Sequence, residues 1–250
     1  MIRSDKLRGS LLRCLQITGL PRAEVAGKIT ELARPSGAIV SHVTDIWMPN
    51  GLMQPNEARI EREKEFLEAD KREALKSWWL VKRRGANTPN WDIASTCMVN
   101  GAKGLIVIEA KAHDKELSID GKSQPTTINS AENHKRIGDA IQQANNGLKK
   151  VLPGWSLTRD SHFQLCNRFA WAWKLASLGI PTVLIYLGFL NAIEMSDQGQ
   201  PFSSAKVWGD CIRSHAQGIV PEDAWERKFY IDGTPLWFLT RALELSFDLR

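Results

Sequence analysis

Two stretches of the chain are apolar without interruption or nearly so. Residues 105–108 (LIVI) and residues 181–190 (PTVLIYLGFL) carry almost no charged or strongly polar side chain. Apolar runs of this length are typical of strands that are buried on both faces of a sheet, as in the parallel part of a mixed sheet. The two runs therefore predict central strands that have a covering layer on each side.

Periods of three and four residues predict the helices of those layers. Residues 132–152 have one apolar face, and residues 161–178 are richer in apolar side chains and end at Gly179, a common helix stop. Residues 55–76 are dominated by charges of both signs around a narrow apolar stripe, which predicts a further helix. The next residues, 77–82 (SWWLVK), are predicted as a strand.

The two ends of the chain are less regular. Residues 1–53 contain two short amphipathic pieces, LLRCLQITGL and PRAEVAGKITELA, and they predict a helical N-terminal appendage to a main domain at 54–250. The same pattern leaves open that these pieces form the outer layer of one single domain. The last fifty residues alternate turns with short amphipathic pieces and show no clear chemistry. The order of elements predicts an α/β fold with a mixed central sheet flanked by helices.

Composition and charge narrow the class of protein only slightly. The 250 residues are 43% hydrophobic and 24% charged, as in an ordinary globular protein. No apolar run is long enough to span a bilayer and no signal peptide opens the chain, so we expect no membrane association. The four cysteines are scattered and form no metal-binding or disulfide pattern, which favours the reducing cytoplasm. A net charge of +5 weakly favours a polyanionic partner.

Charged side chains interrupt the apolar segment that surrounds residues 105–108. Asn100-Gly101 suits a two-residue hairpin turn, and counting outward from that turn places Asp92 opposite Glu109. Directly opposed residues on adjacent strands share a face, with Cβ atoms about 4.5–5.5 Å apart. Lys111 lies two residues beyond Glu109 and shares the same face. The simplest register therefore brings two carboxylates and one ammonium together at the open end of the hairpin.

This cluster has a structural and a functional interpretation. In the structural one, a strand end leaves the core and Lys111 neutralises an acid at the surface. In the functional one, two carboxylates and a nearby backbone carbonyl supply the hard oxygen ligands that Mg2+ prefers. A central strand that ends in acid-x-lysine, opposite a second acid, favours the functional interpretation.

The segment Pro89-Asn90-Trp91-Asp92, followed by Glu109-Ala110-Lys111 at the end of an apolar strand, resembles the PD-(D/E)XK nuclease superfamily. The resemblance covers roughly residues 55–190 and implies a core order α-β-β-β-α-β. It implies that Asp92, Glu109 and the Ala110 carbonyl bind Mg2+ or Mn2+. It also implies that Lys111 orients or deprotonates the attacking water, or holds the scissile phosphate.

The same resemblance implies roles for residues on the helices. An acid of the first helix commonly points to the metal in such enzymes, and Glu61 is the first choice here, with Glu65 close behind. Gln164 is expected to approach the active site, as in the exonuclease-like branch. Nucleic-acid contacts are expected from the following residues: Lys115, Asn167 and Arg168. Structural hydrogen bonds are an equally good explanation for the polar residues of that second helix.

The sequence therefore predicts a Mg2+-dependent nuclease that hydrolyses the phosphodiester bonds of nucleic acid, with DNA favoured over RNA. The alternative is a catalytically silent nucleic-acid-binding module on the same fold. A third interpretation is a globular protein whose hairpin acids are structural. The resemblance also allows a homodimer.

Overall fold

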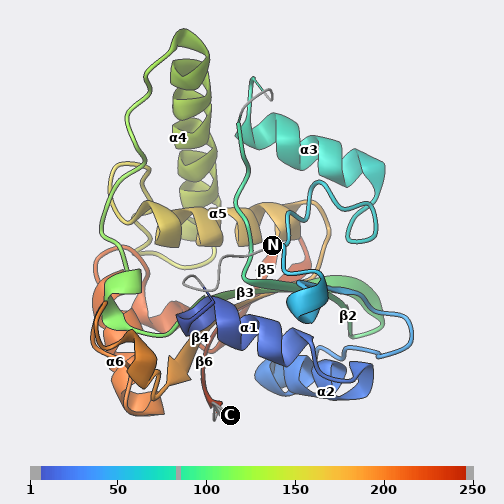
Figure 1. The fold of residues 1–250 in the computed structure, drawn as a ribbon. Coiled ribbons are helices and arrows are strands. Elements are labelled where there is room, and N and C mark those ends of the chain that lie inside the picture. The colour runs from blue at the N-terminus through green and yellow to red at the C-terminus, as the bar shows by residue number, and fades with distance from the viewer. Residues whose placement is uncertain (1–6, 83–85, 246–250) are drawn as a thin grey trace.

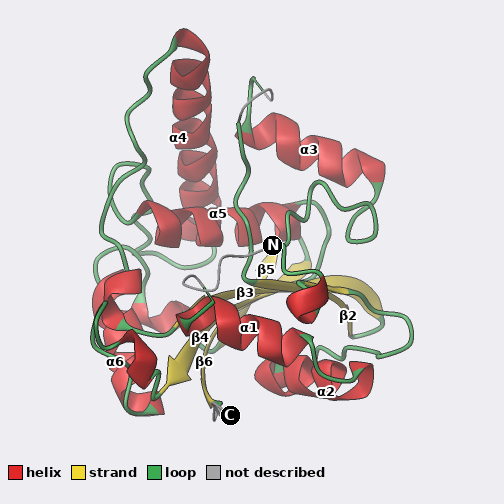
Figure 2. Ribbon diagram, in the orientation of Figure 1, coloured by secondary structure: helices red, strands yellow, loops and turns green. Residues whose placement is uncertain are grey.

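A six-stranded mixed sheet with helices on both faces forms the centre of the molecule (Figures 1 and 2). The structure is a computed structural model, which describes residues 7–82 and 86–245. The strands lie in the order β1-β2-β3-β4-β6-β5. Their bounds are Trp47–Met48 (β1), Ile93–Val99 (β2), Ala102–Lys111 (β3), Thr182–Leu190 (β4), Arg227–Ile231 (β5) and Thr234–Glu244 (β6). The predicted α/β class with a mixed central sheet is confirmed.

The β2–β3 hairpin has the predicted register. Asn100 and Gly101 occupy the turn with φ angles of 49° and 80°, the left-handed values that a two-residue hairpin turn of type I′ requires. Val99 pairs with Ala102 at the turn, and the antiparallel pairing continues to the open end of the hairpin. The charged residues beyond that end therefore lie where counting from the turn had placed them.

The parallel part of the sheet lies beside this hairpin. β4 runs parallel to β3 and β6 runs parallel to β4, whereas β5 is antiparallel to β6 at the edge. The prediction of a buried strand at residues 181–190 is confirmed by β4, which is buried over all but its last residue. The strands β5 and β6 were missed because residues 201–250 lack a long apolar run.

Helices α4 (Ile128–Lys149) and α5 (Phe163–Ser177) confirm the helices predicted at 132–152 and 161–178. α4 begins earlier than predicted because Thr127 caps it: its hydroxyl accepts a hydrogen bond from the Ser130 backbone N–H at 3.1 Å.

The helix predicted at 55–76 is confirmed only over residues 69–76, and the strand predicted at 77–82 is wrong. The helix α3 spans only Ala69–Trp79, and residues 55–68 form turns and an extended segment in which Ala58 pairs with the backbone of Trp91. The predicted strand at 77–82 is instead the end of α3 and a short connection. Both tryptophans of that segment, Trp78 and Trp79, pack edge-on against Trp171 of α5, and this packing outweighs their strand propensity.

The two faces of the sheet have separate hydrophobic cores. α3, α4, α5 and α6 (Ala205–Ala216) pack on one face. α1 (Gly9–Thr18) and α2 (Arg22–Leu32) pack on the other, below the sheet in Figure 1. The helical part of residues 1–53 thus shares a core with the sheet. In the described part of the chain, no helix is both long enough and apolar enough to cross a membrane.

Candidate functional site

The open end of the β2–β3 hairpin positions Asp92 and Glu109. Ile93 pairs with Ile108, so the next pair outward in this register is Asp92 with Glu109. The chain bends at Asp92 and leaves the sheet, and the Asp92 carboxylate replaces the next backbone bond by accepting from the Ala110 N–H at 2.7 Å. The second acid is thereby held against the end of the strand that carries the first.

Glu109 is buried, with 1% of its surface exposed, and both of its carboxylate oxygens bind cations. Lys111 Nζ lies 2.5 Å from Oε1, and Arg168 Nε donates to Oε2 at 2.5 Å. Burial alone would raise the pKa of Glu109, but the charges of Arg168 and Lys111 lower it. Glu109 is therefore ionised and fully neutralised by its neighbours.

Asp92 differs from Glu109 because it has no such compensation. No basic side chain among the described residues forms an ion pair with Asp92, whereas the two nearby cations both bind Glu109. Burial, and next the negative charge of Glu109, raise the pKa of Asp92 to about 8, although Lys111 and the Ala110 N–H oppose this effect. Another cation beside Asp92 would therefore stabilise the ionised form of this carboxylate.

The donor atoms at this position suit a hard divalent cation. Ala110 supplies its N–H to Asp92, and in a strand the carbonyl of the same residue points to the same side, toward the end of β2. Asp92, Glu109 and the Ala110 carbonyl thus offer only oxygen atoms. Mg2+ accepts one or two carboxylates and keeps several waters. In residues 7–82 and 86–245, no three His, Cys, Asp or Glu side chains gather closely enough to form a fuller ligand set.

The helix α5 contributes Arg168 and Asn167 to the cluster from above the sheet. Both are buried, Arg168 Nη1 donates to Asn167 Oδ1 at 2.9 Å, and the guanidinium lies 4.8 Å from the centre of the Trp91 ring. Both residues had been expected to contact nucleic acid. In the structure Arg168 donates to Glu109, and the contact of Arg168 and Asn167 with nucleic acid stays a prediction.

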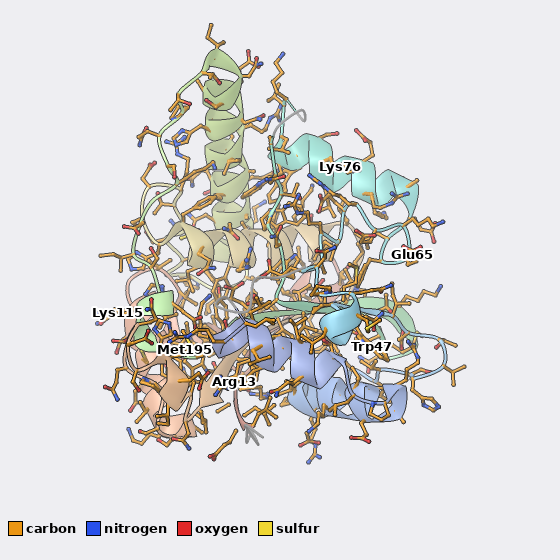
Figure 3. The ribbon with its side chains drawn as sticks, viewed as in Figure 1. Arg13, Trp47, Glu65, Lys76, Lys115 and Met195 are labelled. Atoms are coloured by element: carbon orange, nitrogen blue, oxygen red, sulfur yellow. The ribbon has the colours of Figure 1, made fainter. Side chains whose placement is uncertain are left out.

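Two other predicted residues, Gln164 and Lys115, lie on elements next to the cluster. Gln164 occupies the first turn of α5, one turn before Arg168 and half-buried, which is compatible with an approach to the site. Lys115 is exposed in a short helical turn, Asp114–Glu116, just after β3 (Figure 3). Lys115 can therefore reach a ligand only outside the buried cluster.

Glu61 is buried but binds elsewhere. Its carboxylate accepts a hydrogen bond from the Thr88 hydroxyl and lies 3.5 Å from the Arg62 guanidinium. Glu65 is exposed on the loop before α3 (Figure 3). Glu61 and Glu65 do not lie on a helix, because residues 55–68 form turns and an extended segment. The acid of this segment whose charge acts on Asp92 is Glu57, which accepts from the Asn90 side-chain amide at 2.9 Å.

Sequence reasoning also missed two aromatic residues at the site. Tyr186 of β4 pairs with Glu109 in the parallel register, and burial raises its pKa well above the ordinary value. Trp91 supplies the face on which the Arg168 guanidinium rests. Tyr186 could have been found as the one hydroxyl-bearing aromatic residue within the apolar run at 181–190.

No protein-family model matches the chain, and no curated protein or solved structure is found to be similar to it. The geometry of the cluster therefore carries the functional argument alone. In this cluster both oxygens of the Glu109 carboxylate contact basic side chains, whereas the neighbouring Asp92 carboxylate contacts none among the described residues.

Proposed function

We propose that the protein is a metal-dependent nuclease that hydrolyses the phosphodiester bonds of nucleic acid, with DNA as the preferred substrate. One observation carries the proposal. Asp92 is held by the Ala110 N–H beside a second carboxylate and a lysine, yet it lacks a cation of its own. Asp92 is partly exposed and, with a pKa raised to about 8, is protonated near neutral pH, so a divalent cation bound beside it would favour its ionised form.

The metal would be held by Asp92, Glu109 and the Ala110 carbonyl. When bound, Mg2+ or Mn2+ supplies Lewis-acid stabilisation of charge at the phosphate and lowers the pKa of a bound water. The chain's own part is to fix the Glu109 carboxylate near the end of β3 and to hold the Asp92 carboxylate against the same strand end.

Lys111 acts in this proposal as a positively charged group. Burial would lower its pKa, but the charges of Glu109 and Asp92 raise it above the ordinary value. The ammonium therefore holds its proton while it is paired with Glu109. It can orient a water molecule or hold a phosphate oxygen, but in this state it cannot accept a proton from the water.

Arg168 is a positioning residue. It donates to Glu109 Oε2 while Lys111 contacts Oε1, and its guanidinium rests on the Trp91 ring, so the Glu109 carboxylate is held at both oxygens. Gln164, one turn earlier on the same helix, is proposed to contact the substrate or the attacking water.

A second candidate function is a catalytically silent nucleic-acid-binding module. This candidate is favoured because Lys111 and Arg168 already occupy both oxygens of the Glu109 carboxylate. A metal at this site must share that carboxylate with one of them. The two candidates differ in metal affinity and in cleavage.

Calorimetric titration with Mg2+ and Mn2+, together with a panel of labelled single- and double-stranded DNA and RNA, tests the proposal. We expect one metal site per chain and cleavage in Mn2+, both lost in Asp92→Asn and both retained in Asp139→Asn, which removes an exposed carboxylate on α4. Nucleic-acid binding without metal affinity or cleavage would establish the silent module instead.

The proposal includes a cellular setting and an assembly state. The four cysteines are free in the structure, which is compatible with the reducing cytoplasm. A homodimer is one assembly that the proposal allows, and sedimentation with and without DNA would determine the state.

A further inference from the structure

A cavity of about 500 Å³ opens beside the segment that leads into the carboxylate cluster. Leu11 of α1, Met48 of β1 and Asn90 line it, together with six residues of the turns at 55–63. Each of these lining residues is partly or fully exposed, so a ligand can reach them. The volume lies in the range of about 300–1,000 Å³ that is typical of small-ligand sites.

Backbone pairing places Asp92 at the edge of this cavity. The Ala58 N–H donates to the Trp91 carbonyl at 3.1 Å and the Trp91 N–H donates to the Ala58 carbonyl at 2.9 Å, as in an antiparallel pair. Both side chains are buried in the core, so the residues on either side of them point to the opposite face. These residues are the following: Glu57, Arg59, Asn90 and Asp92. The first three line the cavity, and Asp92 lies opposite Glu57 in the same register.

The Asn90 side chain joins the residues of this face. Its Nδ2 donates to Glu57 Oε2 at 2.9 Å, and its Oδ1 accepts from Arg59 Nε at 2.7 Å. The amide thus fixes one acidic and one basic side chain along the floor of the cavity. A ligand on this floor would lie next to the carboxylate cluster.

Two guanidinium groups at the cavity meet on one neutral oxygen. Arg59 Nη1 and Arg62 Nη2 donate to Asn87 Oδ1 at 2.8 and 3.3 Å. No ion pair joins Arg59 to an acid among the described residues, whereas Arg62 lies 3.5 Å from Glu61. A phosphate oxygen would form stronger, charge-assisted bonds with these groups than a neutral amide oxygen does.

Another part of the wall is apolar. Leu11, Met48 and Pro55 line the cavity there, and all three keep part of their surface exposed. Flat aromatic rings pack well on such surfaces, and a methionine sulfur makes favourable contacts with them. An apolar wall with a few polar groups at fixed positions is typical of sites that orient a small organic ligand.

The charges of the lining select the kind of ligand. Glu57 and Glu63 balance Arg59 and Arg62, so the formal charges of the wall cancel. The carboxylates repel a multiply charged anion such as a nucleoside triphosphate. One nucleotide of a strand suits the cavity better, because it combines a planar base with a phosphodiester group that carries a single negative charge.

We propose that this cavity binds one unpaired nucleotide of a nucleic-acid strand. The base packs on the apolar part of the wall, and its phosphodiester group binds Arg59 and Arg62. A base can enter such a pocket only from a single strand or after it leaves the base-paired stack. The assignment to a strand rests on the proposed function, since a free nucleotide would use the same contacts. The inference therefore names single-stranded or locally unpaired nucleic acid as the substrate class.

The test follows the methionine methyl groups by NMR in the full chain without divalent metal, so that no cleavage occurs. Met48 lines the cavity, whereas Met98 and Met195 do not and serve as internal references. The probes are thymidine 5′-monophosphate, a short single-stranded DNA, its blunt duplex and a sugar-phosphate strand without bases. We expect a saturable shift of the Met48 methyl resonance with the single-stranded DNA, because the ring current of a bound base acts on this methyl group. The duplex and the strand without bases should give much smaller shifts.

Variants at exposed positions test the contacts without a threat to the fold. Arg62→Gln should weaken single-strand binding about tenfold, because it removes a charge-assisted contact. Arg34→Gln is the matched control, since Arg34 is also exposed and also paired with a nearby glutamate, Glu31, but lines no part of the cavity; it should leave binding unchanged. Asn56→Trp places a large side chain at an exposed lining position and should abolish the Met48 response.

The inference is overturned if none of the probes shifts the Met48 resonance saturably. It is also overturned if the duplex or the strand without bases acts as strongly as the complete single strand, or if Arg62→Gln and Arg34→Gln weaken binding equally. A response to thymidine 5′-monophosphate without one to the single strand would overturn the assignment to nucleic acid.

Failure of the inference and failure of the proposed function are distinguishable. Nucleotide binding in a chain that binds no metal and cleaves nothing would keep the cavity assignment and remove the nuclease. Cleavage in Mn2+ that Asn56→Trp leaves unchanged would remove the nucleotide pocket and keep the nuclease.

Discussion

Replacement of Asp92 by asparagine should stabilise the protein, and the gain should depend on pH. Asparagine keeps an oxygen that can accept from the Ala110 N–H, but it removes the negative charge beside Glu109. The folded-state pKa of Asp92 is raised from about 3.8 to about 8, so the folded protein holds a proton that the unfolded chain releases. The contribution of Asp92 to the free energy of unfolding is therefore fully present below about pH 4. It is lost as the pH rises through about 8.

The size of the effect follows from these two pKa values. A difference of one in pKa corresponds to about 1.4 kcal/mol, which sets an upper bound of about 5–6 kcal/mol for the cost of ionised Asp92. Asp92 is partly exposed and its charge is coupled to that of Glu109, so solvent and relaxation reduce this bound. We expect a measured gain of about 2–3 kcal/mol at pH 9 or so and almost none near pH 4.

Urea unfolding of the two proteins at several pH values, without divalent metal, measures the difference directly. The other titrating groups contribute equally to the unfolding free energies of both proteins, so their effects cancel in the difference. Asp139→Asn measures the change in stability that is caused by the loss of an exposed carboxylate alone. Addition of Mg2+ should stabilise the wild-type protein and should have little effect on Asp92→Asn. A stability difference that stays constant from acid to alkaline pH would refute the assignment of Asp92 as the uncompensated acid.

Substitutions at Glu109, Lys111 and Gly188 test the site and the packing around it. Glu109→Gln should reduce the free energy of unfolding by about 3–5 kcal/mol, because it leaves two buried cations without their carboxylate; denaturant titration measures this. Lys111→Ala should lower the single-turnover cleavage rate far more than it lowers the affinity for DNA, which is measured with Ca2+. Lys111→Arg should not restore the cleavage rate. If rate and affinity fall equally and arginine restores both, Lys111 is a binding residue. Gly188→Ala on β4 should destabilise by about 1–3 kcal/mol because its Cβ would lie 2.4 Å from the Trp208 ring, whereas Gly209→Ala on α6 meets no atom and should be neutral or stabilising in thermal melts.

The sequence predicted those parts of the fold that are determined by local pattern. Asn100-Gly101 fixes the hairpin turn, and one turn then determines which residues face each other as far as Asp92 and Glu109. The apolar run of β4 and the apolar face of α4 are equally local signals. These elements could be placed without knowledge of their neighbours.

The failures occurred where tertiary contacts outweigh local pattern. Residues 55–68 have the charge spacing of a helix, yet Ala58 pairs with the backbone of Trp91 and draws the segment along the hairpin. The directions of the Glu57 and Glu61 side chains therefore could not be predicted from helical periodicity. The partner of Arg168 was also beyond prediction, because the height of α5 above β3 depends on packing across the whole core.

The position of β6 between β4 and β5 has a consequence for how the protein is made. β4 pairs with residues that begin at Leu236, 46 positions after β4 ends at Leu190. At roughly 5–20 residues per second, a ribosome needs about 2–9 seconds to supply that partner. During this interval the nascent chain carries a long apolar strand with one unpaired edge, the type of surface that recruits other chains. Slow translation between these strands, or an early stop before β6, should therefore increase aggregation, and holdase chaperones should reduce it.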